Sequence, residues 1–210
     1  MKNLFIFLAV SMTIGFFNSG KAFSDIIIEF SDGVTTGTNF DVSAGDAITF
    51  FVFVTETNSN TQLSVDGLAG FGLHADYSAS SGTSATVTAN STNPVFDFEV
   101  DTSFSNSELD MAAFILTNSA PKATSIQLGQ FTVQTSASGV TNFVFGDYSN
   151  LTDFVTGKTP TPEDLDPTIF SGDRTFDLTL NAVPEASSSI FVLLSGLIFT
   201  MRRRRPHRLA

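Results

Sequence analysis

Ile48-Thr49-Phe50-Phe51-Val52-Phe53-Val54 is a run of β-branched and aromatic residues in the first third of the chain. Such residues favour strands because they pack well on a pleated surface. Successive side chains of a strand point to opposite faces, so this run would place apolar groups on both. That pattern indicates a strand in mid-sheet or under a covering loop, and it predicts a strand over residues 47–55.

Shorter runs on both sides of this strand alternate between apolar and polar residues. Residues 176–180 do so, as do residues 96–100, where Phe96, Phe98 and Val100 would share a buried face. Gly, Asn, Asp and Ser clusters separate the runs, which is typical of an all-β sandwich. We predict an antiparallel sandwich of about nine strands. The expected strands are residues 26–30, 47–55, 71–77, 85–89, 95–100, 111–117, 125–133, 141–145 and 175–180.

Two segments need a local argument. The apolar positions change parity between Leu128 and Phe131, so one extra residue must be absorbed, and a β-bulge at Gly129-Gln130 would do this. Residues 108–116 also have spacing compatible with a helix capped by Ser107. The β propensity of residues 114–117 and the surrounding strands favour a strand there.

The charge of the chain is unevenly distributed. The net charge is −11, but residues 23–183 hold three basic and twenty acidic side chains, a net charge of −17. Affinity for nucleic acid or an anionic lipid surface rests largely on Lys and Arg, so neither is an expected partner of this part. The chain has no cysteine, which excludes disulfides and thiolate chemistry.

The N-terminus has the order of a secretory signal. Lys2 is followed by an apolar run over residues 4–17, and Ser19-Gly20-Lys21-Ala22 places small residues before a cut after Ala22. We therefore assign residues 1–22 to a signal peptide, expected to be helical and to engage the Sec translocon.

The C-terminus predicts a membrane anchor. Residues 186–201 carry no charge and are followed by Arg202, Arg203, Arg204 and Arg205. The uncharged stretch would span about 24 Å as a helix, and extension toward Ala182 with snorkelling arginines would complete a transmembrane helix. By the positive-inside rule the arginines stay cytoplasmic, which places residues 23–181 outside.

The sorting motif Val183, Pro184 and Glu185, the apolar span and the Arg cluster together resemble the PEP-CTERM sorting signal of Gram-negative bacteria. The sequence departs from that signal at Ala186, where a second proline is usual. The resemblance covers the tail, residues 182–210. It implies processing by an exosortase, transient anchoring in the inner membrane, delivery to the cell envelope, surface or extracellular matrix, and association with exopolysaccharide and biofilm.

The middle of the chain, residues 23–181, has a second resemblance. Phe40-Asp41-Val42-Ser43-Ala44-Gly45-Asp46, then residues 68–77, then Leu128-Gly129-Gln130-Phe131-Thr132-Val133 are similar in order to motifs of cohesin-like jelly-roll sandwiches. Cohesins bind dockerin modules through a sheet face. The resemblance therefore implies a jelly roll with a protein-binding face.

No residue pattern in this sandwich indicates catalysis. His74 is its single histidine and falls on the face opposite Phe71, Leu73 and Tyr77, which predicts a solvent-facing strand histidine of no special role. Acidic residues alone would suffice for glycoside hydrolysis, so composition does not exclude a glycosidase. The absence of Trp and the presence of only two Tyr argue against sugar stacking, and the 23 Phe suggest an aromatic core.

The one long connection, residues 147–173, is rich in Pro and Asp. Its oxygen ligands could hold calcium, with Asp164, Asp166 and Asp173 as candidates, although no EF-hand spacing is present. The other interpretation is a plain solvated loop, and we expect no other cofactor.

Two functions follow from these patterns. The first is an exported, non-catalytic interaction protein of the cell surface or matrix, whose partner is a surface polysaccharide or another surface protein. The alternative is a secreted glycosidase or polysaccharide-modifying enzyme on a β scaffold.

Overall fold

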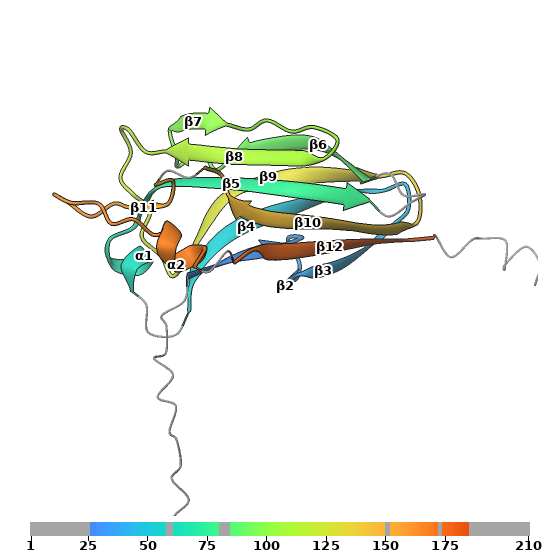
Figure 1. The fold of residues 1–210 in the computed structure, drawn as a ribbon, viewed down its shortest axis with the longest axis horizontal. Coiled ribbons are helices and arrows are strands. Elements are labelled where there is room, and N and C mark those ends of the chain that lie inside the picture. Colours follow the sequence, from blue (N-terminus) through green and yellow to red (C-terminus); the bar gives the residue numbers. More distant parts are fainter. Residues whose placement is uncertain (1–25, 58–60, 80–84, 150–151, 172–173, 185–210) are drawn as a thin grey trace, which may run out of the picture.

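A computed structural model describes residues 26–57, 61–79, 85–149, 152–171 and 174–184 of the protein. Two β-sheets pack face to face and enclose one core (Figure 1). The predicted signal helix and transmembrane helix lie outside the described residues. Within the described ranges, no helix is long and apolar enough to cross a bilayer.

The smaller sheet has five strands in the order β2-β1-β4-β9-β6. The apolar run at 48–54 lies in β4, at the centre of this sheet, as predicted. The strands are β1 (Ile26–Ser31), β2 (Thr36–Gly37), β4 (Ala47–Glu56), β6 (Ala85–Thr92) and β9 (Ser125–Thr135).

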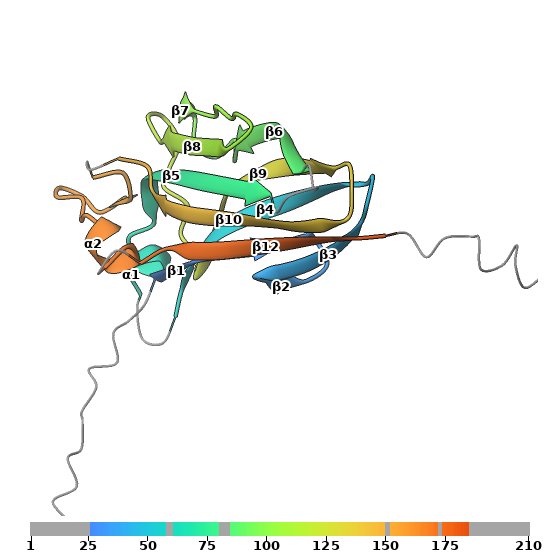
Figure 2. The same ribbon diagram turned by 45° about the vertical axis from the view of Figure 1, so that its right-hand side comes forward.

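The larger sheet has seven strands, six of them in the order β3-β12-β10-β5-β8-β7, while β11 pairs with β5 off this path. All nine predicted strands exist, and the sandwich is antiparallel as predicted except for one pair of strands. β3 runs parallel to β12 (Figure 2), so the last strand lies beside the third strand of the chain. The strands are β3 (Asn39–Ser43), β5 (Leu68–Ala79), β7 (Phe98–Asp101), β8 (Glu108–Phe114), β10 (Gly139–Asp147), β11 (Val155–Thr156) and β12 (Phe176–Val183).

The core is strongly aromatic, as the composition predicts. Phe131 of the smaller sheet lies 5.5 Å from Phe143 and 5.8 Å from Phe145 of the larger sheet, measured between ring centroids. Phe30 approaches Phe145 to 4.7 Å from the same side. Tilted ring pairs at these separations contribute favourable interaction energy beyond the burial of their area, so these four phenylalanines stabilise the packing of one sheet on the other.

The bulge predicted in β9 is present, shifted by one residue. Gly129 lies opposite Val52 and Gln127 opposite Phe53, so Leu128 is the extra residue relative to β4. A Cβ atom on Gly129 would lie 2.4 Å from the Ser91 carbonyl oxygen and 2.5 Å from the Met111 sulfur. The bulge therefore needs glycine because another strand and the core both approach it closely.

The predicted buried face of residues 95–100 is wrong in part. Phe96 is buried, but Phe98 and Val100 are 49% and 45% exposed. Residues 93–97 form a turn, in which the Phe96 amide donates to the Asn93 carbonyl, and the strand starts only at Phe98. The strand predicted over 111–117 is β8, which begins earlier and ends at Phe114.

The long connection after β10 is not a plain solvated loop. Phe154, Leu165 and Ile169 are fully buried, and β11 adds to the larger sheet. The connection contains the short helix α2 (Asp166–Ile169), which lies at the same end of the sandwich as α1 (Gln62–Val65) in both views (Figures 1 and 2).

Candidate functional site

The outer face of the larger sheet carries a row of acidic side chains. The register aligns Asp177 of β12 with Val144 of β10, Val144 with Asp76 of β5, and Asp76 with Glu108 of β8. All four side chains are exposed. We call the outer surface of these four strands, with His74 and Asp110, the acidic face.

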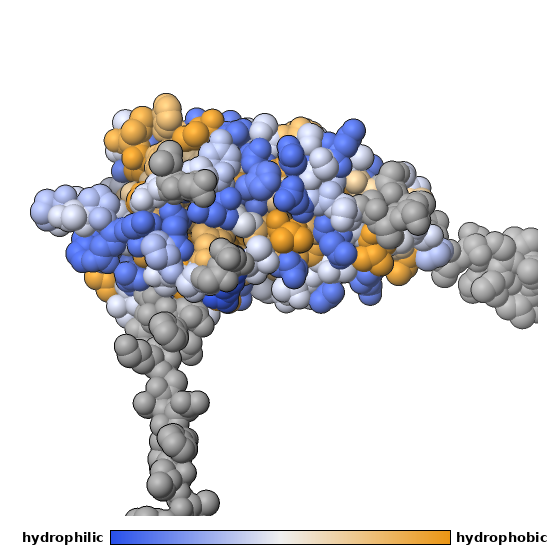
Figure 3. All heavy atoms as spheres, viewed as in Figure 1, coloured by the Kyte–Doolittle hydropathy of each residue, from blue (hydrophilic) through white to orange (hydrophobic). Residues whose placement is uncertain are grey.

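This row is unfavourable for the isolated protein. Asp76 and Glu108 lie directly opposite each other, and like charges in such a cross-strand pair destabilise a sheet. Val144, which is 40% exposed, places an apolar group between Asp76 and Asp177. The visible face is largely hydrophilic with small hydrophobic areas (Figure 3). Such a surface is complementary to a partner that combines positive charge with apolar contact.

His74 lies in the next row and joins two carboxylates. Its Nδ1 is 2.6 Å from Asp110 Oδ1, and its Nε2 is 3.6 Å from Asp76 Oδ1. The imidazole is on the outer face, as the alternation predicts, but it is only one third exposed. The His74–Asp110 contact adds a side-chain link to the backbone pairing of β5 with β8.

The electrostatic surroundings of His74 favour its charged form. Partial burial alone lowers the pKa of His74, but the hydrogen bond and charge of Asp110, with further contributions from Asp76 and Glu108, raise it overall. Nucleophilic catalysis by a Ser-His-Asp group needs a hydroxyl on the second ring nitrogen. Here Asp76 faces that nitrogen. The arrangement thus stabilises the protonated imidazole of His74 and places a carboxylate, not a hydroxyl, at its second nitrogen.

A hydrogen-bonded chain extends the acidic face toward the turn after β7. The Ser103 hydroxyl donates to Asp110 Oδ2 over 3.2 Å, and the Ser103 amide donates to Asp101 Oδ1 over 2.8 Å. The Tyr148 hydroxyl donates to Asp101 Oδ2 over 2.9 Å. These donors fix the carboxylates at this end of the face in one orientation.

The calcium candidates do not form a common site in the described structure. Asp166 is buried, and its carboxylate accepts the backbone N–H groups of Asp153 and Phe154 at 2.8 and 3.1 Å. Asp164 is exposed, and Asp173 lies outside the described residues. No group of three or more His, Asp or Glu side chains in the described ranges is arranged to hold a metal ion.

The predicted sorting motif is described only at its beginning. Val183 ends β12, where it lies opposite Ser43, and its carbonyl oxygen accepts the Ala44 amide. Pro184 is exposed. Glu185 and Arg202, Arg203, Arg204 and Arg205 lie outside the described residues.

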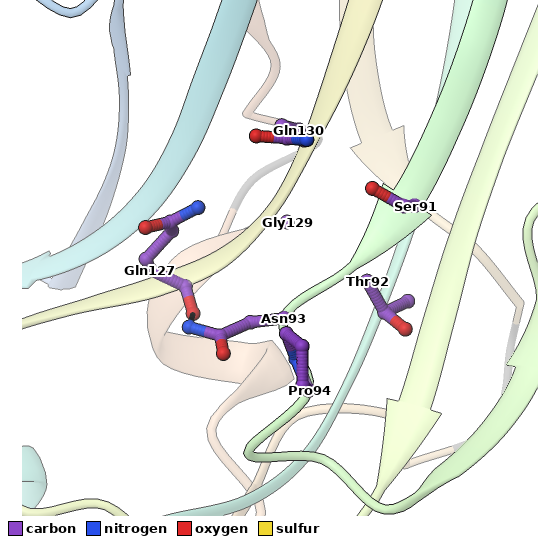
Figure 4. A pocket seen from close by; sticks show the side chains of 7 residues that line it. All are labelled: Ser91, Thr92, Asn93, Pro94, Gln127, Gly129 and Gln130. Atoms are coloured by element: carbon purple, nitrogen blue, oxygen red, sulfur yellow. Dashed lines mark hydrogen bonds between the residues drawn. The ribbon is translucent and has the colours of Figure 1, made fainter.

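Two cavities of about 300 Å³ occur elsewhere on the sandwich. One, of about 320 Å³, is lined by residues of β6 and β9 and contains no carboxylate (Figure 4). The other, of about 310 Å³, lies at β1, β2 and β12 and contains one carboxylate, that of Glu29. A glycosidase needs two carboxyl groups across the scissile bond, and neither cavity provides them.

Comparison with known proteins places the fold. No protein family and no curated protein matches the sequence. The solution structure of CaCohA2 from Clostridium acetobutylicum is similar, with a TM-score of 0.51 and 10% sequence identity over 78% of this chain and 94% of that one. The fold is cohesin-like.

Other cohesin structures match with lower scores. The seventh ScaB type I cohesin of Pseudobacteroides cellulosolvens has a TM-score of 0.45 at 9% identity, covering 77% of this chain and 93% of its own. The non-cellulosomal cohesin of Archaeoglobus fulgidus has a TM-score of 0.43 at 10% identity, covering 81% and 98%.

Sequence reasoning placed His74 on the outer face without assigning it a role, and it missed the acidic face. Asp76, Glu108, Asp110 and Asp177 belong to three different strands, and only the register places them together. The available signal was the polar phase of each alternating run. That phase gives the outer face of a strand but not which strand lies next to it.

Proposed function

We propose that this protein is exported and serves as a non-catalytic interaction module at the cell surface, where the acidic face binds a protein that presents Lys and Arg. The observation that carries this proposal is the exposed row Asp177-Val144-Asp76-Glu108 on an open sheet. A basic partner would relieve the repulsion between Asp76 and Glu108 and contact Val144.

The fold supports the same proposal. CaCohA2, the similar structure from Clostridium acetobutylicum, forms a complex with CaDoc0917. A cohesin-like sandwich in an exported protein suits the role of a docking module. The PEP-CTERM-like tail would bring it to the envelope by way of an exosortase, in the setting of exopolysaccharide and biofilm.

Site-specific photocrosslinking in living cells tests the acidic face. The full-length protein carries p-benzoylphenylalanine in place of Asp76 in one strain and in place of Val65, an exposed residue at the end of α1, in the matched control. We expect one discrete protein adduct from position 76 and none from position 65. Added salt should reduce the yield, because exposed charge pairs are screened at high ionic strength.

A second strain tests whether the negative charge of the acidic face is needed, with the crosslinking residue at a neighbouring position that leaves Asp76 and Glu108 free to be changed. Asp76→Lys with Glu108→Lys should abolish an adduct formed from p-benzoylphenylalanine in place of Asn142, one row further along β10. Equal adducts from positions 76 and 65, or an adduct that survives both Lys substitutions, would contradict the proposal.

A further inference from the structure

The outer face of the smaller sheet has a different chemistry from the acidic face. Phe51 and Phe53 of β4 point outward and are partly exposed, while Phe50 and Val52 fill the core. The two residues are about 7 Å apart along the strand, since each residue rises about 3.4 Å. Among the described residues, Gly33 approaches this surface, and a Cβ on it would lie 3.3 Å from the Phe51 ring.

Each outward phenylalanine lies beside an outward glutamine. Phe51 lies opposite Gln130 of β9, and Phe53 lies opposite Gln127. In the described part of the chain no hydrogen bond engages the side-chain amide of Gln127 or Gln130. Each amide therefore offers a donor and an acceptor group to a ligand.

The glutamines also line the cavity of about 320 Å³, whose lining comes from the paired strands β9 and β6 and the turn that follows β6. Figure 4 shows Gln127 and Gln130 on β9, with Ser91 and Thr92 on the neighbouring, paired strand β6. The Asn93 side chain closes one end, because its Nδ2 donates to the Gln127 carbonyl over 2.9 Å. The remaining lining residues are Pro94 and Gly129.

No charged side chain lines this cavity, in a part of the protein that carries a net charge of −17. Hydroxyl and amide groups beside partly exposed aromatic rings are suited to a ligand with apolar faces and many hydroxyl edges. An anionic chain would be repelled by the surrounding charge, while a basic protein would meet the Glu29 carboxylate, which lies opposite Phe53, but no charged side chain in the cavity itself. The occupant that fits is uncharged and polyhydroxylated.

We infer that the outer face of the smaller sheet, formed by Phe51, Phe53, Gln127, Gln130 and Ser91, binds a neutral polysaccharide chain. The sugar rings stack on Phe51 and Phe53, and the two glutamine amides hydrogen-bond to hydroxyl groups. Phe replaces the Trp and Tyr that more often stack on sugars, so the rings supply contact area and the glutamines supply the polar groups. The site lies on the opposite sheet from the acidic face and does not depend on the proposed function.

Affinity electrophoresis of the full-length protein tests this site. The protein is run in a zwitterionic detergent without a sugar headgroup, through gels that contain hydroxyethyl cellulose, glucomannan, dextran or arabinogalactan, with alginate as the anionic comparison. We expect at least one of the four uncharged polymers to retard the protein and alginate to have no effect.

Variants then assign the binding to this face. Gln127→Ala with Gln130→Ala should weaken retardation at least tenfold, and Phe53→Ala should also weaken it. Asn39→Ala, an exposed amide on β3 of the other sheet, is the matched control and should leave retardation unchanged. The glutamine variant should fold, because both substitutions are on the outer face of β9. Far-UV circular dichroism and thermal unfolding check this.

Two results would overturn the inference. One is the absence of retardation by all four uncharged polymers. The other is undiminished retardation of the folded glutamine double variant. Crosslinking from position 76 is unaffected by either result, so failure of this site and failure of the acidic face can be told apart.

Discussion

Asp166 is a carboxylate that the fold buries at the start of α2 while two backbone amides donate to it. Burial raises the pKa of Asp166 to about 7, and the charges of Asp147 and Asp164 act in the same direction, outweighing the two backbone hydrogen bonds. Sequence reasoning singled out this residue as a metal ligand. In the structure Asp166 has a role within the fold, because its two carboxylate oxygens accept the backbone N–H groups of Asp153 and Phe154 and hold that segment in place.

The raised pKa of Asp166 predicts pH-dependent stability. Between its ordinary pKa of 3.8 and about 7, the folded protein retains a proton that the unfolded chain has released. Stability therefore falls as the pH rises through this window, by at most about 1.4 kcal/mol per pH unit from this group. Urea unfolding of the wild type at pH 5, 6, 7 and 8 should show this decline, followed by circular dichroism.

The variant Asp166→Asn should be less stable than the wild type at pH 5, since its amide accepts only one of the two backbone N–H groups. Its stability should change less between pH 5 and 7. His74, whose pKa is also raised, leaves a residual decline above about pH 6.5. Asp177→Asn on the exposed face is the control and should retain the wild-type slope. Equal slopes for the wild type and Asp166→Asn would contradict this assignment.

At the scale of elements, β7 shows how a turn can break an alternating pattern. Phe96 enters the core from a turn and contacts Phe71 at a centroid distance of 4.8 Å. The Asp97 carboxylate accepts the backbone amides of Leu116, Thr117 and Asn118 at the end of β8. That interaction holds the turn, so the strand begins later and Phe98 lies on the surface.

Two alanine substitutions distinguish the turn from a continuous strand. Phe96→Ala should lower the free energy of unfolding by about 3–5 kcal/mol, because it removes a buried ring. Val100→Ala should change it by less than about 0.5 kcal/mol, because that side chain is 45% exposed. Urea denaturation measures both. Similar losses for the two variants would restore the alternating strand that the sequence suggests.

At the scale of the whole molecule, the last strand of the sandwich runs two residues into the predicted sorting tail, residues 182–210. β12 ends at Val183, and its last residues pair with β3 in the parallel ladder. The last strand is therefore held by hydrogen bonds to the third strand of the chain. The described part of the sandwich ends only two residues before Glu185, which lies outside the described residues.

Removal of residues 185–210 tests the tail without cutting a described strand. We expect the truncated protein to be secreted and to appear in the medium, while the full-length protein fractionates with the envelope. Immunoblots of medium, periplasm and membrane fractions measure the distribution. Arg202→Ser through Arg205→Ser should have a weaker effect, because the apolar segment remains. Retention of the truncated protein in the envelope would contradict the anchoring role of the tail.

The all-β class, the nine predicted strands and the aromatic core were predictable from the sequence alone. The reason is local: side-chain alternation, β propensity and turn residues act within a few positions, and the runs satisfy them except at residues 95–100, where a turn breaks the alternation. The parity change near Gly129 was sufficient to predict a bulge for the same reason.

Only the tertiary structure decided which surfaces carry chemistry. The row from Asp177 to Glu108, the contact of His74 with Asp110, and the pairing of Phe51 and Phe53 with Gln130 and Gln127 each join residues from different strands. Strand order and register depend on how all the faces pack at once, which no local pattern specifies. The parallel β3–β12 ladder and the buried long connection are outcomes of that same global packing.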